Sequence, residues 1–306
     1  MGMSHATPER LRHEQYMSLS SPFRIFRHHI DTRIDVHWHE FCELALVIGG
    51  QGTHVVNGTP APLRKGLLFL MTPADFHEII PDPGQRIDLY NVIFSEPFIR
   101  PELFRRLFAP RGDTCVWLGE EAFPAFEAEF ARMWRESEQR QEDSEFIIQG
   151  ALERVLIDRE RLRRNGREKR EEAGSPLPEP LGEEARRLHP SIRSAVTYIQ
   201  HHFREPLTLA EVASHAGLSA NYFSECFSKQ VGASFQCYLQ ERRLQFAHSL
   251  LCVTALPVTE ICYASGFSTL NHFERSFKKK YGRAPRSLRT ERNARPDHMP
   301  TNSPGG

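Results

Sequence analysis

Three histidines and one glutamate near the start of the chain are spaced so that they could act together. His37 and His39 are two positions apart in HWHEFCELALV, and Glu43 follows four positions after His39. Alternate side chains of an extended strand share a face, so the first two imidazoles point the same way. His77 lies in a later run and adds a third ring. Such a set can hydrogen-bond the hydroxyls of an organic ligand, or its members can bond one another.

The segment that must position these groups, residues 23 to 99, has the composition of β-structure. Its runs ELALVI, GTHVVN, GLLFLM, HEII and IDLYNVIF are short, and Gly, Pro and Asn separate them. Closely spaced strands with such turns predict a small antiparallel barrel or sandwich, because closing a sheet removes its exposed edges.

The last third of the chain contains the same helix–turn–helix pattern twice. In TLAEVASHAGLSANYFSECF, Thr208 and Glu211 form a capping box, and Gly217 turns the chain into a second helix. In VTEICYASGFSTLNHFERSFKKKYG, Gly266 takes the same place. A steep crossing of two helices needs small residues at the contact and a glycine where φ is positive. The sequence therefore predicts two helix-turn-helix units.

The segment between the two glycines, SFQCYLQERRLQFAHSLL, has apolar residues at helical spacing. A connecting helix of about eighteen residues would span roughly 27 Å. With the half-widths of the flanking helices, the two second helices would lie about one turn of B-DNA apart, roughly 34 Å.

Residues 190 to 290 resemble the DNA-binding domain of the AraC/XylS family of bacterial transcription regulators. The motifs that carry the resemblance are AEVASHAGLSANYFSECFSKQVGASF, RRLQFAHSLL and EICYASGFSTLNHFERSFKKKYGRAPRSLR. They cover about a third of the chain. In that family two helix-turn-helix units of one chain enter adjacent major grooves, so the resemblance implies double-stranded promoter DNA as a partner.

The exposed residues of each second helix would face the bases, since that helix enters the groove. We expect these residues to be Ala220, Asn221, Ser224, Glu225, Thr269, Leu270, Asn271, Glu274 and Arg275. Asn would pair with adenine, Arg with guanine and Glu with cytosine; the alternative for each is a solvated helix face. Phosphate contacts are expected from Lys278, Lys279, Lys280, Arg283, Arg286 and Arg289. Phe223, Phe227, Phe273 and Phe277 are predicted to be core residues.

The segment that holds the three histidines is similar to the two cupin motifs and to the ligand-binding domain of sugar-responsive AraC-family members. The similarity rests on HWHEFCELALVIGGQGTHVVNG, GLLFLMTPADFH and LYNVIF. In metal-binding cupins, a set such as His37, His39, Glu43 and His77 holds a divalent ion such as Fe, Mn, Ni or Zn. Regulators of this type usually lack the metal, so the resemblance implies a ligand-binding set, no catalytic residues and no cofactor. The segment PADFH also departs from the enzyme pattern, and no Asn follows His77 at the expected distance.

Two amphipathic segments, EAFPAFEAEFARMWRESE and SEFIIQGALERVLIDRERLRR, follow between Glu120 and Leu162. Their apolar stripes could lie against the barrel. In related regulators helices at this place form the homodimer contact, so the resemblance implies a homodimer, with the second segment as the better candidate.

The expected domain organisation follows from these segments. The chain should be an all-β, cupin-like ligand-binding barrel (20–105), a helical dimerisation region (106–164), a flexible linker (165–187), an all-α double helix-turn-helix domain (188–290) and a disordered tail (291–306). Lys and Arg number 16 and Asp and Glu 8 from residue 185 onward, against 23 and 31 before it. The basic part is therefore the one expected to approach a polyanion.

The remaining features concern location. No apolar run approaches the length of a membrane span, the N-terminus lacks a secretory core, and the six cysteines contain no C-x-x-C pair. We expect a cytoplasmic protein without a membrane partner.

Two functions of different classes remain open at this stage. The first is a ligand-responsive, sequence-specific DNA-binding regulator, an activator of sugar- or carbohydrate-related genes, with a sugar as effector and RNA polymerase as a further partner to consider. The second is a cupin metalloenzyme with an appended DNA-binding module. The paired helix-turn-helix motifs favour the first, which is not an enzyme.

Overall fold

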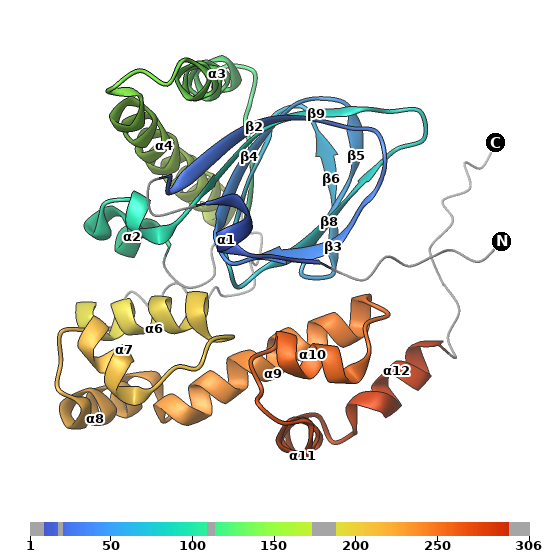
Figure 1. Cartoon of the computed structure of the whole chain (residues 1–306), viewed down its shortest axis with the longest axis vertical. Helices are drawn as coiled ribbons and strands as arrows, with labels where there is room; N and C mark the ends of the chain where they lie inside the picture. Colours follow the sequence, from blue (N-terminus) through green and yellow to red (C-terminus); the bar gives the residue numbers. More distant parts are fainter. Residues whose placement is uncertain (1–8, 18–20, 109–113, 173–187, 294–306) are drawn as a thin grey trace.

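The computed structural model describes residues 9–17, 21–108, 114–172 and 188–293. Its first part, here called the β-domain, contains two five-stranded sheets (Figure 1). One has the order β1-β3-β8-β5-β6 and the other β10-β7-β4-β9-β2. The strands are β1 Glu9–Leu11, β2 Phe23–Ile30, β3 Ile34–His39, β4 Cys42–Gly49, β5 Gln51–Val56, β6 Thr59–Arg64, β7 Leu67–Met71, β8 Phe76–Pro81, β9 Ile87–Phe94 and β10 Cys115–Trp117.

Strand pairing within the β-domain is antiparallel except between β1 and β3, which are parallel. β4 has a continuous run of apolar residues rather than the alternation expected for an antiparallel strand with one solvated face. Ala45 and Val47 pack with the core between the sheets, whereas Leu44 and Leu46 pack toward the helices on the other side. Both faces of β4 are covered, so hydrophobic residues occur at every position rather than at alternate ones.

Helices cover the outer face of the second sheet. Besides the short helices α1 His13–Tyr16 and η1 Glu96–Phe98, they are α2 Pro101–Leu107, α3 Phe123–Gln139 and α4 Ser144–Glu172. The apolar stripe of α4, including Leu152 and Val155, is buried together with Phe130 of α3 and Leu44 of β4. The stripes recognised in the sequence therefore pack within the chain. The large apolar side chain that α4 leaves exposed is Phe146, at 72%.

The predicted linker begins later in the structure than in the sequence analysis. α4 continues to Glu172, through the first part of the segment 165–187. Just before that segment, Arg163 and Arg164 pair with Glu160 at helical spacing, which stabilises the helix there. The rest of that segment, 173–187, lies outside the described residues. α12 includes the first residues of the predicted tail, and 294–306 lie outside the described residues.

The second part, here called the helical domain, contains α6 to α12. Their bounds are α6 Pro190–His202, α7 Leu209–His215, α8 Ala220–Val231, α9 Phe235–Val253, α10 Val258–Ala264, α11 Leu270–Tyr281 and α12 Pro285–Asn293. The predicted capping box is present, with Thr208 accepting from the backbone of Glu211. Gly217 and Gly266 have φ of 69° and 84°. Both predicted helix-turn-helix units are confirmed as α7–α8 and α10–α11, joined by α9.

The core of the helical domain combines aliphatic side chains with several phenylalanines. Phe223, Phe227, Phe273 and Phe277 are fully buried, as predicted. No helix among the described residues is long and apolar enough to cross a membrane.

Candidate functional site

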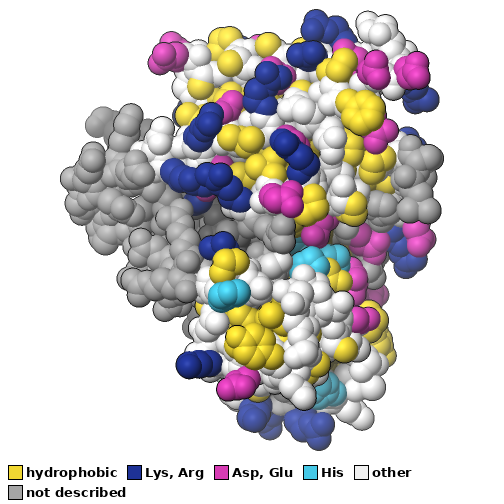
Figure 2. All heavy atoms as spheres, turned by 90° about the vertical axis from the view of Figure 1, so that its left-hand side faces the viewer, with side chains coloured by type: hydrophobic (Ala, Val, Ile, Leu, Met, Phe, Trp, Pro, Cys, Tyr) yellow, Lys and Arg dark blue, Asp and Glu magenta, His cyan; other side chains and the backbone are white. Residues whose placement is uncertain are grey.

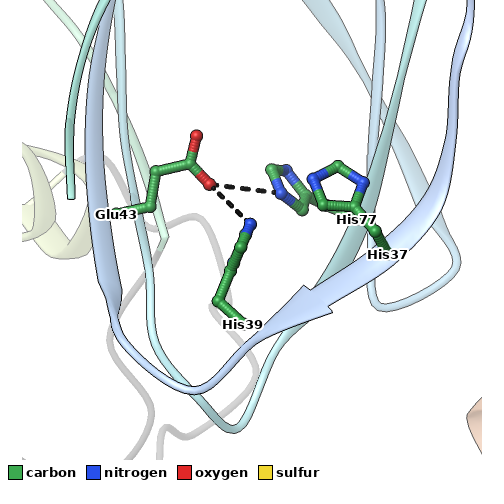
Figure 3. A group of neighbouring side chains, drawn as sticks. All are labelled: His37, His39, Glu43 and His77. Carbon is green, nitrogen blue, oxygen red and sulfur yellow. Dashed lines mark ion pairs between the residues drawn. The ribbon is translucent and has the colours of Figure 1, made fainter. Parts of the chain in front are cut away.

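The structure brings the three histidines and the glutamate of the first third together (Figure 3). His37 and His39 lie on β3, His77 lies opposite His37 on β8, and Glu43 is near the start of β4 in the other sheet. Each offers one ligand atom, and these four atoms all lie within 4.8 Å of one another. We call these residues the histidine–glutamate cluster.

Burial controls the charge of the cluster. It lowers the pKa of His77 to about 3 and holds the pKa of His39 well below its usual value, with further lowering from His77 and His37. Burial also raises the pKa of Glu43, although neighbouring histidines and Asn91 oppose this effect. The imidazoles of His39 and His77 are therefore neutral at neutral pH, and each has a nitrogen lone pair available to a ligand.

Further residues fix the orientation of the cluster. Nδ1 of His37 lies 2.9 Å from the carbonyl oxygen of Asp35, and Nδ1 of His77 lies 2.8 Å from Nε2 of His54. Asn91 donates to Oε1 of Glu43 at 2.8 Å. Sequence reasoning missed His54 and Asn91. The sequence does contain a signal for His54: in the predicted strand GTHVVN, the alternation of side chains places His54 on the face that points into the barrel.

The strand that holds two cluster residues also contacts the helical domain. Trp38, between His37 and His39, packs against Phe246 of α9 with ring centroids 6.2 Å apart. Phe76, adjacent to His77, packs on the same ring at 5.8 Å. Arg204, just after α6, donates to the backbone carbonyl of His39 at 2.7 Å. β3 thus holds two residues of the cluster and also contacts the helical domain.

A second contact between the domains is made by two histidines at the end of α6. His201 is buried with its ring against Phe104 and Phe108. His202 lies 3.5 Å from Glu96 of the β-domain and 3.1 Å from Glu205. Burial alone would lower the pKa of His202, but its hydrogen bonds with Glu205 and Glu96 raise it to about 9.

We expect Glu96→Gln to lower the pKa of His202 from about 9 toward its ordinary value of 6.5. A folded-state pKa above the unfolded value stabilises the fold fully below pH 6.5, and this stabilisation is lost as pH rises through about 9. The variant should therefore lose part of the pH dependence of unfolding in that window. An NMR titration of the His202 ring measures the pKa directly, and an unchanged value would contradict the contact between domains.

The predicted base-contacting residues lie on the two second helices. α8 and α11 are on the side of the helical domain that faces away from the β-domain (Figure 1). Asn221, Ser224 and Glu225 of α8 are exposed, as are Thr269, Asn271 and Arg275 of the second unit, whereas Ala220, Leu270 and Glu274 are partly buried. Tyr222, at 58% exposure, shares the α8 surface and was not predicted.

Two of the residues predicted to contact phosphate also have partners within the chain. Arg289 donates to the carbonyls of Leu256 and Thr254, and Lys280 pairs with Glu241. Lys278 and Lys279 are exposed in the last turn of α11. Lys and Arg side chains are visible at the end of the molecule farthest from the β-domain, as they are over the β-domain itself (Figure 2). The basic groups at this end are therefore accessible to a polyanion.

Comparison with protein families assigns both parts of the chain. A model of an AraC-like ligand binding domain matches residues 20–156, and a model of a helix-turn-helix domain matches residues 212–291. The chain belongs to the AraC family of transcription regulators. It combines a ligand-binding domain with a DNA-binding domain in the order that the sequence predicted.

Relatives within the AraC family extend over most of the chain. The HTH-type transcriptional activator RhaS of Escherichia coli strain SMS-3-5 is 25% identical over 271 residues, which cover 84% of this chain and 88% of that protein. Among solved structures, the C-terminal domain of AraT from Geobacillus stearothermophilus is 36% identical and covers 38% of this chain and 99% of its own, with a TM-score of 0.35. ToxT from Vibrio cholerae is 13% identical, covers 87% and 98%, and has a TM-score of 0.38.

The two family models and the RhaS relative define the class of activity. The AraC-family chain is a ligand-responsive transcription regulator that binds DNA through its helix-turn-helix units. The metalloenzyme alternative gains no support from the comparisons, since the matching relatives are regulators.

Proposed function

We propose that this regulator is a cytoplasmic, homodimeric activator. Its affinity for promoter DNA would change when a small polar effector binds at the histidine–glutamate cluster. A sugar or sugar-derived compound is the effector class we propose, because imidazole and carboxylate groups suit hydroxyls. The exposed face of α4 around Phe146 is the proposed dimer contact. RNA polymerase is the further partner that an activator requires.

The observation that carries this proposal is the double role of His39. Its ring belongs to the cluster, 3.1 Å from Glu43, while its backbone carbonyl accepts from Arg204 of the helical domain. An effector that displaces β3 at His39 would also displace Trp38, which lies next to His39 on β3 and packs against Phe246 of the helical domain. A ligand that favours one position of β3 will shift the balance between two arrangements of the domains by its difference in affinity for them.

The direct test uses purified full-length protein and a random pool of duplex DNA. Selected sequences should contain two half-sites about one helical turn apart, roughly 34 Å, since one chain presents two second helices. A reporter fused to the selected promoter, in a strain that lacks the protein, should then respond to the effector. Expression that stays unchanged with every candidate inducer would count against ligand-responsive activation.

Arg275→Ala and Lys279→Ala should separate base contacts from phosphate contacts in the second unit. Both side chains are exposed on α11. If Arg275 reads a guanine, its removal should cost about 1–3 kcal/mol at one base pair and relax specificity there. Lys279→Ala should weaken binding to all sequences and reduce the salt dependence by about one phosphate. Competition binding with single-base variants of the site, at several salt concentrations, measures both; a uniform loss in Arg275→Ala would identify a phosphate contact instead.

A further inference from the structure

We propose that Arg243 of α9 is a positioning residue for DNA recognition. It fixes the angle between the two helix-turn-helix units, and so the spacing of half-sites that one chain accepts. It acts through residues 203–205, here called the junction loop, which follow α6. The inference goes beyond the proposed function, since it requires only that the two units bind DNA and involves no effector.

α9 is the first link between the two units, and each unit packs on its own part of it (Figure 1). In the first unit, the ring of Phe227 on α8 lies 5.6 Å from the ring of Tyr238, centroid to centroid. In the second unit, Gln240 donates to the hydroxyl of Ser276 on α11 at 2.5 Å. A helix that joins two bodies sets the distance between them. By itself it leaves each body free to tilt about the helix end.

Arg243 ties the junction loop to α9. Its Nε donates to the carbonyl oxygen of Phe203 at 2.6 Å, and its Nη2 donates to the carbonyl oxygen of Glu205 at 2.7 Å. Phe203 is the C-cap of α6, where carbonyl groups lack partners within the helix and the helix dipole is negative. The planar fork of a guanidinium holds both carbonyls in one fixed geometry. The loop therefore cannot move independently of α9.

The junction loop also contacts the turn of the second unit. A Cβ on Gly266 would lie 2.8 Å from Cα of Arg204 and 2.9 Å from Nε of Arg243. The turn between α10 and α11 thus lies directly against the loop and the guanidinium. On the other side of the loop, α6 contacts the first unit, since Oγ of Ser194 lies 3.3 Å from Nε2 of His215 on α7. The loop is therefore a second link between the units, and two links oppose rotation of one unit against the other.

The β-domain supports the same loop. Arg204 donates to the carbonyl oxygen of His39 at 2.7 Å, and its guanidinium lies 5.3 Å from the centre of the Phe246 ring. A displacement of β3 would therefore act on the junction loop and, through it, on the angle between the two units.

This angle decides which DNA the chain fits. One base pair of B-DNA advances the next site by about 3.4 Å and rotates it by about 35°. Two recognition helices held at a fixed angle match one spacing, because one extra base pair turns the second half-site away from its helix. Units that pivot would accept neighbouring spacings.

The test uses full-length protein and duplexes with two half-sites recovered from random DNA, at the recovered spacing or one base pair longer or shorter. The natural chain should prefer the recovered spacing about 10-fold or more, since a displaced unit loses base contacts. Arg243→Met keeps the apolar stem but neither hydrogen bond, so we expect the preference to fall to about threefold or less. Arg243→Lys, which can keep one bond, should lie between them. Fluorescence anisotropy with labelled DNA measures each affinity.

Arg242→Met is the matched control from the adjacent position. Its guanidinium lies 5.0 Å from the centre of the Tyr238 ring, on the part of α9 that holds the first unit. The spacing preference of this variant should equal that of the natural chain. The preference is a ratio measured on one protein, so a partly unfolded sample lowers both affinities equally and leaves the ratio unchanged.

Two results would overturn the proposal: an unchanged preference in Arg243→Met and Arg243→Lys, or an equal fall in Arg242→Met. If Arg243→Met does not fold, as circular dichroism would show, Arg243→Lys alone decides. The measurement contains no effector, so a chain without any effector response would refute the proposed function and leave this result standing.

Discussion

Gly266→Ala should destabilise the helical domain by about 2–5 kcal/mol and weaken binding to DNA that carries two half-sites. Two penalties add at this position. The glycine has a φ of 84°, which costs an L-residue about 1–2 kcal/mol. A Cβ would also lie 2.8 Å from Cα and 2.9 Å from the carbonyl oxygen of Arg204. Backbone atoms must then shift, and such overpacking costs about 1–3 kcal/mol more.

Gly217→Ala is the matched control, because this glycine occupies the same turn in the first unit. Its φ is 69°, but a Cβ there would meet nothing within 4 Å. We expect a loss of only about 1–2 kcal/mol, from the backbone conformation alone. Urea denaturation of both variants, followed by circular dichroism, measures the difference. Equal losses would mean that the second turn tolerates the added methyl group and that its contact with Arg204 is loose.

The helical domain was predictable because its determinants are local. The capping box at Thr208, the turn glycines and the spacing of the four core phenylalanines are all read from neighbouring residues, and each lies where expected. The second helix of the second unit begins at Leu270, where the side chain of Thr269 accepts from the backbone of His272. The exact first residue of a helix depends on which nearby hydroxyl accepts a hydrogen bond from the free backbone N–H groups of the first turn.

The cluster was predictable only in part. Alternation along β3 places His37 and His39, but only strand pairing brings His77 opposite His37 and brings His54 behind it. The apolar stripes of α3 and α4 were also visible, yet the sequence does not say whether a stripe meets a sheet or a second chain. The structure buries Leu152 and Val155 together with Leu44 of β4 and leaves Phe146 exposed.

The contact between the domains could not be predicted, because its members are far apart in the chain. Trp38 and Phe246 are separated by most of the sequence, and the residues around each of them do not indicate that the two rings are in contact. Arg204 resembles any basic residue after a helix, yet it donates to His39 and its guanidinium lies 5.3 Å from the centre of the Phe246 ring. The route from the cluster to the helical domain is thus a property of the folded chain alone.

Phe246→Ala should therefore break that route while costing about 3–5 kcal/mol, the usual loss for a buried phenylalanine. Phe246 is buried, and its ring meets Trp38, Phe76 and Phe203. The first two belong to the β-domain, so the variant should still bind DNA when it is assayed at low temperature, where it stays folded, but should lose its response to the effector. Fluorescence anisotropy with labelled DNA, with and without the effector, measures the response.

Trp38→Ala supplies the complementary change from the β-domain, and the double variant completes the cycle. If the two rings act together, the double variant should lose less stability than the sum of the single losses, by about 0.5–1.5 kcal/mol for an aromatic pair. Additive losses with an unchanged DNA response in either single variant would mean that the rings only fill space. The effector signal would then have to pass through the hydrogen bond between Arg204 and the carbonyl of His39. In that case Arg204→Lys, which keeps the charge but loses the guanidinium group, should abolish the response of DNA binding to the effector.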